Sequence, residues 1–513
     1  MTTVRLYNTL TRTLEEVTPM EPGKVRIYCC GPTVYDLPHA GHARAALAPD
    51  LLVRHLRARG LEVTYVRNIT DVDDKILARA RERGEEPLEL SRRMATAYQE
   101  KMKELGCLAP DHEPKVSEHL EDIFALITEL VASEHAYVVE LAGGRRDVYF
   151  SVRSFPDYGK LSRRKIDDLM VGARVEKGES KRDPLDFALW KGGTADEWGW
   201  DSPWGRGRPG WHIECSAMSS HYLGRSFDIH AGGMDLIFPH HENEIAQSEA
   251  AHPEATPMAR IWMHNGFVNV DKEKMSKSLG NFVTVEDVLA RNDAEGFRWF
   301  LLGVQYRGPI QFDTEKLESG RVVFPGVDEA ERRVDYMVRT RERLRELLDS
   351  SMTAPAKLPP ELTRLRDAAN QALEEGRAAL DDDLNTPVAL AALGEIARIA
   401  NEVADLALKR RKDSSFVGAA AVAARLVEVT LGKLAGELGV LSTPVAEYRL
   451  RTRERRVRLR GLTADAIDRL VDERALARKN RDFARSDAIR DELAALGVVL
   501  KDSLVGSEWS IDV

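Results

Sequence analysis

The chain has 513 residues, of which 43% are hydrophobic and 31% are charged, and it carries a formal net charge of −9. This composition is typical of a globular protein with two to four domains, and it excludes fibrous and disordered classes. The net negative charge argues against non-specific binding to polyanions, although a local basic face would still permit a nucleic-acid partner.

The first 85 residues alternate between strand and helix patterns. After an N-terminal stretch without the apolar core of a secretory signal, the sequence predicts a strand over 24–30 and a second strand over 61–70. The segments 40–60 and 71–84 have the apolar spacing of amphipathic helices, and Gly60 ends the first of them. This strand–helix–strand–helix order predicts a parallel sheet.

Residues from about 90 to 190 interrupt this alternation and predict an insertion. They contain a helical pattern over 115–133 and a predicted hairpin over 136–152. Strand patterns resume at 225–233 and 261–270. We therefore expect the sheet domain to be interrupted by a separate unit.

The character of the chain changes after residue 315, where long charged helices dominate. The clearest cover 331–350 and 361–380, a proline-rich linker separates them, and a second exposed joint lies near residue 410. The last segment contains a predicted helix over 481–497 and two predicted strands. The sequence therefore predicts an α/β domain with a parallel sheet (1–314), a helical bundle (315–446) and a small α+β domain (447–513).

An arginine-rich run, RLRTRERRVRLR, occupies residues 449–460 and contains seven arginines and one glutamate. Arginine binds phosphate with two hydrogen bonds and stacks on bases, so the run favours contact with RNA. A solvated basic helix face is the alternative, and the sequence does not separate the two.

Cys29 and Cys30 are adjacent, although the chain has only four cysteines. Four cysteines at such uneven spacing are too few for a disulfide scaffold, which indicates a reducing, cytoplasmic compartment. No apolar run approaches the length needed to cross a bilayer, so we expect no membrane partner.

Strand periodicity separates the two adjacent cysteines. Side chains of a strand alternate between two faces, so Val25, Ile27 and Cys29 share one face while Tyr28 and Cys30 share the other. Cys30 lies at the carboxyl end of its strand, where open α/β sheets bind their ligands. Position therefore favours Cys30 as the functional thiol, and the alternative is that both cysteines pack in the core.

Cys215, in GWHIECSAM, and the segment HHENE supply further ligands of the kind that zinc prefers. His240 and Glu244 are four residues apart and would share one face of a helix. With the thiols of Cys30 and Cys215 they form a tetrahedral zinc set. The adjoining histidine and glutamate of HHENE are equally available by type, and a capped surface helix is the alternative interpretation.

Two segments have the features of phosphate-binding sites. The segment HAGH (39–42) begins a helix, where backbone N–H groups and the helix dipole suit a phosphate chain, and Gly41 permits close approach. The segment KMSKS (274–278) places two lysines in a flexible loop that can neutralise a pyrophosphate leaving group. Taken alone, HAGH has the alternative interpretation of histidines that only cap a helix. Taken alone, KMSKS has the alternative interpretation of a solvated lysine-rich turn.

Together these segments resemble the cysteinyl-tRNA synthetases of the bacterial type, a family of class I aminoacyl-tRNA synthetases. The class I signatures are His-Ile-Gly-His and Lys-Met-Ser-Lys-Ser, and here Ala40 replaces the isoleucine while KMSKS is intact. The stretches CGPTVYD, VRNITDVDDKI, PLDFALWK, GGMDLIFPHHENEIAQS and ARKNRDFARSDAIRDELAALG also match in family order. The resemblance implies a Rossmann-like catalytic domain, a bundle that binds the anticodon stem and a C-terminal domain that recognises the anticodon.

The resemblance also assigns roles to individual residues. One zinc ion per chain would be bound by Cys30, Cys215, His240 and Glu244. The amino-acid pocket would be lined by Gly31, Thr33 and Trp211. ATP and the adenylate would be contacted by His39, Gly41, His42, Asn68, Gly233 and Asp235. Catalysis would depend on His39 and His42 together with Lys277, supported by Lys274, at the transition state that releases pyrophosphate.

The implied reaction joins L-cysteine to tRNA(Cys) in two steps, with ATP and Mg²⁺ as cosubstrate, and we expect a monomer. Serine differs from cysteine by one atom, and pocket shape resolves a small change by only about 1–3 kcal/mol. A thiophilic zinc ion that binds the substrate thiolate would supply the selectivity, so no editing domain is needed.

Two alternatives share parts of this pattern. A ligase that joins cysteine to an amino sugar has the same catalytic motifs, but that family lacks the long tail present here. A non-catalytic, zinc-containing RNA-binding paralogue is the other alternative, and the intact KMSKS segment and both HAGH histidines argue against it.

Overall fold

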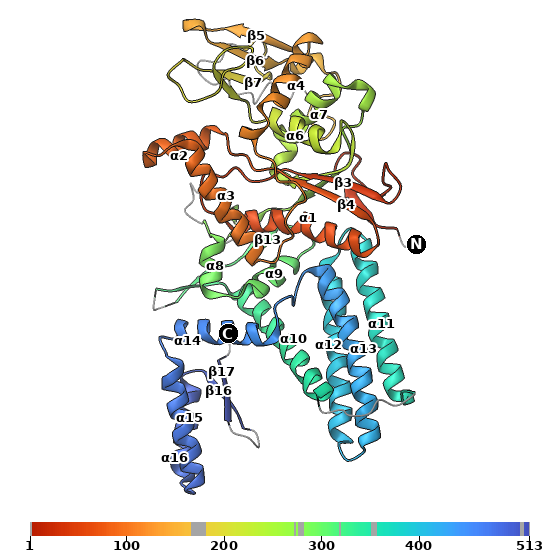
Figure 1. Ribbon diagram of the computed structural model, residues 1–513, viewed down its shortest axis with the longest axis vertical. Helices are drawn as coiled ribbons and strands as arrows, with labels where there is room; N and C mark the ends of the chain where they lie inside the picture. Colours follow the sequence, from red (N-terminus) through yellow and green to blue (C-terminus); the bar gives the residue numbers. More distant parts are fainter. Residues whose placement is uncertain are drawn as a thin grey trace.

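The structure, a computed structural model, describes residues 3–165, 181–270, 273–274, 282–317, 320–349, 357–502 and 507–511. Figure 1 shows an elongated molecule with a parallel sheet near its centre. The inserted unit lies at one end, and the helical bundle and the C-terminal unit lie at the other end (Figure 1).

Four parallel strands form the central sheet in the order β10-β9-β3-β4, as the alternation of strands and helices predicts. These strands are β3 (Lys24–Cys29), β4 (Glu62–Arg67), β9 (Phe227–Gly233) and β10 (Ala259–Asn265). Val25, Ile27 and Cys29 pack in one hydrophobic core, whereas Tyr28 packs in a second core with Cys30 against it. The predicted separation of the two cysteines is therefore confirmed.

Helices and a short ribbon surround this sheet. The antiparallel ribbon of β1 (Arg5–Asn8) and β2 (Thr13–Glu16) lies beside β10, where the N–H of Thr9 donates to the carbonyl of Trp262 at 2.9 Å. The helices are α1 (Ala40–Ala58), α2 (Asp74–Arg83), α3 (Pro87–Glu104), α6 (Ile213–Leu223) and α7 (Glu242–Ala251). Because α1 links β3 to β4, its first residues lie at the carboxyl edge of the sheet.

The inserted unit contains α4 (Leu120–Ala132) and an antiparallel sheet in the order β5-β6-β7-β8. Its strands are β5 (Ala136–Glu140), β6 (Arg146–Phe150), β7 (Phe187–Gly192) and β8 (Gly207–Pro209). The predicted helix and hairpin are confirmed by α4 and the β5–β6 pair. The sheet continues to Pro209 instead of ending near residue 190, because the short β8 lacks the alternation by which strands are recognised.

A second group of strands follows the parallel sheet. It comprises β11 (Val268–Val270), β12 (Glu273–Lys274) and β13 (Ile310–Phe312) in the order β12-β11-β13, with α8 (Val285–Arg291), α9 (Ala294–Leu302) and the hairpin of β14 (Glu315–Lys316) and β15 (Val322–Val323). The backbone of Lys274 lies in β12. The rest of the KMSKS segment, including Lys277, lies outside the described residues.

Four long helices form the bundle: α10 (Pro325–Asp349), α11 (Pro360–Asp381), α12 (Thr386–Lys409) and α13 (Ser414–Leu438). Their buried faces belong to the same core as β3 and α1, so the bundle packs directly on the sheet domain. By length and composition α13 is apolar enough to cross a membrane, contrary to the expectation from sequence. However, 56% of its apolar stretch is buried inside the bundle, so we assign it as a core helix of that bundle.

The C-terminal unit has its own small core, which includes Val457, Ile489 and Trp509. Its elements are α14 (Val445–Leu459), α15 (Ala464–Lys479), α16 (Phe483–Ala495), β16 (Val498–Asp502) and β17 (Ser507–Ile511). The arginine-rich run lies on α14. Five of its arginines form ion pairs with carboxylates of this chain, namely Arg449, Arg451, Arg453, Arg455 and Arg456. Arg455 and Arg456 are buried, so these two arginines form neither a solvated basic face nor a surface open to RNA.

His55, near the end of α1, is a buried link between the sheet domain and the bundle. Its Nε2 lies 2.9 Å from Oδ1 of Asp381 on α11, and its Nδ1 lies 3.1 Å from Oε2 of Glu437 on α13. Burial alone would lower the pKa of His55, but the hydrogen bonds and charges of the two carboxylates outweigh burial and raise the pKa above its ordinary value of 6.5.

This raised pKa predicts a pH-dependent contribution to stability. Protonated His55 stabilises the folded protein fully below the unfolded value of 6.5, and the contribution is lost as pH rises through the folded pKa. Relative to His55→Gln, we expect the free energy of unfolding of the wild type to decrease as the pH rises above 6.5 and through the raised pKa of the folded state. Urea unfolding of both proteins across this range measures the difference, and parallel pH profiles would contradict the prediction.

Candidate active site

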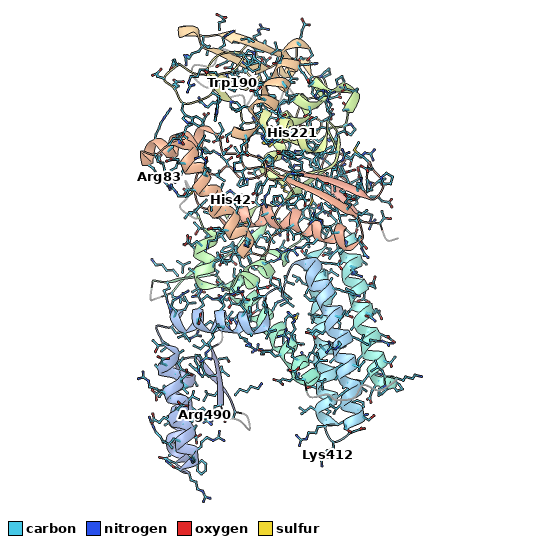
Figure 2. All side chains as sticks on the ribbon, in the orientation of Figure 1. His42, Arg83, Trp190, His221, Lys412 and Arg490 are labelled. Atoms are coloured by element: carbon cyan, nitrogen blue, oxygen red, sulfur yellow. The ribbon has the colours of Figure 1, made fainter. Side chains whose placement is uncertain are left out.

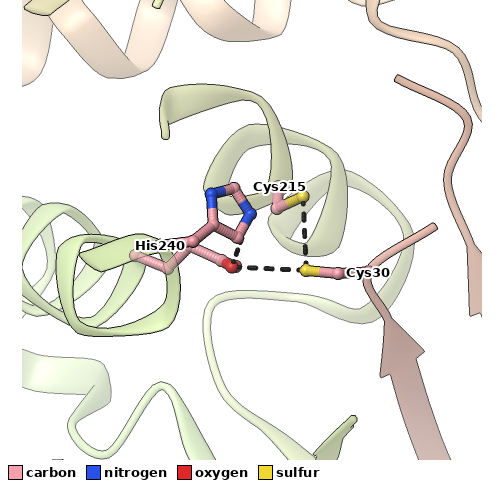
Figure 3. Close-up of side chains that lie close together, drawn as sticks. Cys30, Cys215 and His240 are labelled. Atoms are coloured by element: carbon pink, nitrogen blue, oxygen red, sulfur yellow. Dashed lines mark hydrogen bonds and ion pairs between the residues drawn. The ribbon is translucent and has the colours of Figure 1, made fainter. Parts of the chain in front are cut away.

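The sulfur atoms of Cys30 and Cys215 lie 3.5 Å apart beside the carboxyl end of β3. Cys30 follows the last residue of β3, and Cys215 lies in the first turn of α6. Figure 3 shows the two sulfurs and the His240 side chain converging from three different segments. The Sγ of Cys30 also lies 3.4 Å from Oε1 of Glu244.

His240 and Glu244 reach the sulfurs from the third segment. His240 lies in a turn, Ile237–His241, that is kinked at Phe238 and leads directly into α7, and Glu244 lies in the first turn of α7. The Nε2 of His240 is 3.2 Å from Oε1 of Glu244. Ligand atoms of Cys30, Cys215, His240 and Glu244 all lie within 4.8 Å of one another. The structure thus brings together the four residues that were predicted as metal ligands.

Burial sets the protonation of this cluster. It lowers the pKa of His240 to about 3, so the imidazole is neutral and can offer a lone pair. It raises the pKa of Cys215 to about 11 and that of Cys30 well above its ordinary value, so the thiols ionise only beside a cation. Burial alone would raise the pKa of Glu244, but His230 and His240 outweigh burial and lower it.

These four donors fit a tetrahedral zinc ion. With Zn–S bonds of about 2.3 Å, a tetrahedral site separates its two sulfurs by roughly 3.7 Å, and the observed separation is 3.5 Å. A second set, Cys30, His230, His241 and Glu244, lies within the same distance limit and shares two residues with the first. Because zinc is thiophilic, the set with two sulfurs is favoured.

Asn68 fixes the turn that follows Cys30. Its Oδ1 accepts the N–H of Gly31 at 2.8 Å and lies 3.8 Å from the Sγ of Cys215. A Cβ on Gly31 would lie 1.6 Å from the backbone oxygen of Asn68, so only glycine fits. Thr33 forms a parallel bridge to Thr70 beside this turn. Asn68 is buried behind the cluster, and its contact with an adenylate stays a prediction.

Trp211 forms a partly exposed wall beside the cluster. Its ring stacks on the imidazole of His240 with centroids 4.4 Å apart and planes inclined by 24°. Because 36% of Trp211 is exposed, the indole offers an apolar surface next to the metal ligands. Such a pairing of an aromatic wall with a few polar groups suits a small organic substrate.

His39 and His42 cap the start of α1. Each Nδ1 accepts the backbone N–H of the other residue at 3.3 Å, and the two imidazole rings stack with centroids 3.6 Å apart. Figure 2 places His42 near the centre of the molecule. The two histidines therefore do cap the helix, as the alternative interpretation states. Contacts of His39, Gly41 and His42 with ATP stay predictions.

The remaining predicted residues lie along the same edge of the sheet. Gly233 ends β9 and the exposed Asp235 follows it, and a Cβ on Gly233 would lie 2.5 Å from Oδ1 of Asp235. The carboxyl edge of an open parallel sheet is where such folds bind ligands. The metal cluster, the start of α1 and the end of β9 therefore surround one region.

Two histidines that sequence reasoning missed support the metal cluster. The Nε2 of His230, on β9, lies 2.9 Å from Oε2 of Glu244, and the Nδ1 of His212 lies 3.2 Å from Nδ1 of His240. Such outer partners orient metal ligands. The strand FDIHAGG carries its histidine between apolar residues, and that buried position is the signal that identifies His230.

Glu242, which by residue type was an alternative ligand, has a different role. Its buried carboxylate accepts backbone N–H groups of Gly159 at 2.9 Å and Ser162 at 2.7 Å in the inserted unit. Lys160 adds an ion pair with Glu249 on the same helix. The inserted unit therefore holds α7, which supplies Glu244.

Comparison with known proteins gives matches along most of the chain. The family model for the class I (C) tRNA synthetase catalytic domain matches residues 16–321, the DALR domain matches 377–442, and the cysteinyl-tRNA ligase anticodon-binding domain matches 460–509. A cysteine–tRNA ligase of Anaeromyxobacter dehalogenans (strain 2CP-1) is 50% identical over 99% of this chain and 100% of that relative. A cysteine–tRNA ligase of Geobacter metallireducens is 45% identical over 99% of both chains.

Solved structures show the same fold at low sequence identity. Mycobacterium tuberculosis methionyl-tRNA synthetase in complex with methionyl-adenylate is 16% identical, with a TM-score of 0.58 over 81% of this chain and 91% of that one. A ternary LeuRS–tRNA–LeuAMS complex of Agrobacterium radiobacter is 14% identical, with a TM-score of 0.58 over 84% and 87%. At these identities the likeness establishes the fold alone.

Proposed function

The chain belongs to the cysteine–tRNA ligase family, and from that premise we propose that it joins L-cysteine to tRNA(Cys) in two ATP-dependent steps. The observation that carries the proposal is the four-donor cluster of Cys30, Cys215, His240 and Glu244 beside the exposed Trp211. In the first step the cysteine carboxylate attacks the α-phosphate of ATP and pyrophosphate leaves. In the second step a hydroxyl of the terminal ribose of the tRNA attacks the carbonyl of the cysteinyl-adenylate, the ester forms and AMP leaves.

Selection of cysteine is assigned to the metal cluster. A zinc ion bound there would supply a soft Lewis acid that favours a thiolate over a hydroxyl group. The ion would be held by Cys30, Cys215, His240 and Glu244. His230 orients Glu244, and His212 orients His240. Gly31 and Thr33 would line the amino-acid pocket, together with Trp211, which stacks on His240.

The ATP side is assigned to the start of α1 and the end of β9. His39, Gly41 and His42 lie at the α1 N-terminus, where the helix dipole favours phosphate. Lys274 and Lys277 would stabilise the charge of the leaving pyrophosphate, with Mg²⁺ on the ATP phosphates. Catalysis then needs no side-chain nucleophile, because positioning and charge stabilisation are sufficient.

We assign tRNA recognition to the two C-terminal parts. The bundle (315–446) would contact the anticodon stem, and the last segment (447–513) would recognise the anticodon. The matches to the DALR domain and to the anticodon-binding domain support this assignment. We further propose a monomer in the cytoplasm.

Two assays test the proposed function. Cysteine-dependent exchange of pyrophosphate into ATP reports the first step, and its absence would favour a non-catalytic RNA-binding protein. Formation of cysteinyl-tRNA reports the second step, and transfer to an amino sugar instead of tRNA would favour the other ligase. We expect exchange with cysteine, weak exchange with serine, and esterification of tRNA(Cys).

Removal of the metal gives a further prediction. Chelation is expected to lower cysteine-dependent exchange by more than about tenfold, and stoichiometric zinc should restore it. The metal content of each sample is measured by atomic absorption alongside the exchange rate. Full exchange by protein with less than about 0.1 zinc per chain would contradict the assigned role.

A further inference from the structure

The turn over residues 304–308, between α9 and β13, contacts three separate parts of the molecule. One is α1, which begins with the HAGH segment. The second is the junction between β10 and β11, on the route to Lys274. The third is the loop between α11 and α12 in the bundle. One short turn therefore connects the bundle to two elements of the ATP side.

Arg44 joins the turn to α1. It lies two residues after His42 and is 3% exposed. Its Nη1 donates to the carbonyl of Leu301 at 2.6 Å, and its Nη2 donates to the carbonyls of Val304 at 3.2 Å and Gln305 at 2.8 Å. A buried guanidinium held by backbone carbonyls ties the position of α1 to the position of the turn.

Gly266 joins the turn to the strands that lead to Lys274. Its N–H donates to the carbonyl of Tyr306 at 2.8 Å. A Cβ on Gly266 would lie 2.5 Å from the carbonyl oxygens of both Arg307 and Gly308, so the two backbones are in direct contact. The strand that follows, β11, pairs with β13 and with β12, which ends at Lys274.

Asp383 holds the same turn from the side of the bundle. It is 5% exposed, and its Oδ1 accepts the hydroxyl of Tyr306 and the N–H of Tyr7, both at 2.8 Å. Its Oδ2 accepts Nε of Arg307 at 2.7 Å and the side chain of Gln305 at 3.0 Å. The backbone φ of 57° lies in the left-handed region, which aspartate and asparagine tolerate better than most residues.

We propose that Asp383 is a positioning residue for the ATP side of the active site. It fixes the 304–308 turn, which holds α1 through Arg44 and the approach to Lys274 through Gly266. The inference rests on the proposed function, because it concerns the ATP-dependent step. The cysteine side is built on β3, α6 and α7 instead, so loss of the Asp383 charge should act on ATP and spare cysteine.

The test compares two neighbouring aspartates. Asp383→Asn removes the charge, keeps the shape and suits the left-handed backbone. Asp382→Asn is the matched control, because Asp382 is adjacent, 52% exposed and paired with Arg5 at the surface, where ion pairs contribute little. For Asp383→Asn we expect about a tenfold loss of kcat/KM for ATP in pyrophosphate exchange. KM for cysteine and zinc content should stay within about twofold of wild type, and the melting temperature should stay within a few degrees. The control should match wild type in all of these quantities and in kcat/KM for ATP.

The outcomes separate this inference from the proposed function. Wild-type ATP kinetics in Asp383→Asn, or a parallel loss for ATP and cysteine, would overturn the inference alone. Absence of exchange in the wild type would overturn the proposed function. Equilibrium dialysis would then compare ATP binding by the wild type and by Asp383→Asn, and equal binding would overturn the inference about Asp383. If Asp383→Asn does not fold, Gln305→Ala removes two hydrogen bonds to the same residue. In that variant kcat/KM for ATP should fall by about threefold while KM for cysteine is unchanged. An unchanged kcat/KM for ATP would count against the inference.

Discussion

Replacement of Cys30 by alanine is expected to abolish zinc binding and to lower kcat/KM for cysteine by more than about a hundredfold, because loss of even an outer-sphere partner of a metal ligand costs about 10–100-fold. Cys29→Val is expected to leave both quantities near the wild-type values. The two cysteines are adjacent in sequence, so the pair is a matched test of the site.

The difference follows from the two faces of β3. Cys30 lies beyond the strand with its sulfur 3.5 Å from Cys215 and 3.4 Å from Glu244. Cys29 is 2% exposed and packs with Val25 and Ile27 in the core on the other side of the sheet. Valine has a similar volume and hydrophobicity, so it can replace Cys29 with little loss of packing.

Zinc content by atomic absorption and pyrophosphate exchange with cysteine measure the two effects, and thermal unfolding controls for stability. Equal damage from both variants would show that the functional assignment of the two thiols is wrong. Zinc retained at wild-type stoichiometry in Cys30→Ala would remove Cys30 from the ligand set and favour other donors of the cluster.

Local rules predicted the thiols of the metal cluster and a His–Glu pair near residue 240, and the family resemblance then favoured His240 and Glu244 over the equally available His241 and Glu242. Strand alternation separated Cys30 from Cys29, and the four-residue spacing placed His240 and Glu244 together. Because the chain has only four cysteines, Cys215 was then favoured as the second thiol ligand. The structure adds a detail that the spacing does not contain, since the turn that carries His240 ahead of α7 is kinked at Phe238.

Long-range partners were not predictable, because nothing in a local pattern encodes which distant side chain will face a residue. His230 contacts Glu244 only after β9 and α7 pack together. Glu242 has the same chemistry as Glu244 and lies on the same helix, yet it binds backbone groups 80 and 83 residues earlier in the chain. For the same reason the sequence did not predict the ion pairs of the arginine run. Its partners Asp293, Glu331 and Asp335 are more than a hundred residues away.

These arginines form a buried ionic cluster between α14 and the body of the molecule. Glu331, on α10, is 1% exposed at its side chain and pairs with Arg455 and with Arg456, the latter at 2.6 Å. Its Oε2 also accepts the N–H of Asp293 at 2.8 Å. Asp293 in turn pairs with Arg455 at 3.1 Å and with Arg451 at 2.8 Å. The cluster therefore holds α14, and with it the C-terminal unit, against α9 and α10.

Glu331→Gln is expected to destabilise the protein by about 3–5 kcal/mol, because it leaves two buried guanidinium groups without their shared carboxylate. Glu329→Gln is the matched control on the same helix, since Glu329 is 55% exposed and pairs with Arg332 and Arg333 at the surface. Urea unfolding measures both changes, and the control should stay within about 0.5 kcal/mol of wild type.

The same substitution separates docking of the C-terminal unit from catalysis. If α14 detaches from α10, esterification of tRNA(Cys) should fall by more than about tenfold while cysteine-dependent pyrophosphate exchange is retained, because the residues assigned to exchange lie outside α14 and the C-terminal unit. Exchange and esterification that fall together would mean that the cluster stabilises the whole fold and not this junction. Unchanged unfolding of Glu331→Gln would contradict the stabilising role assigned to the buried cluster.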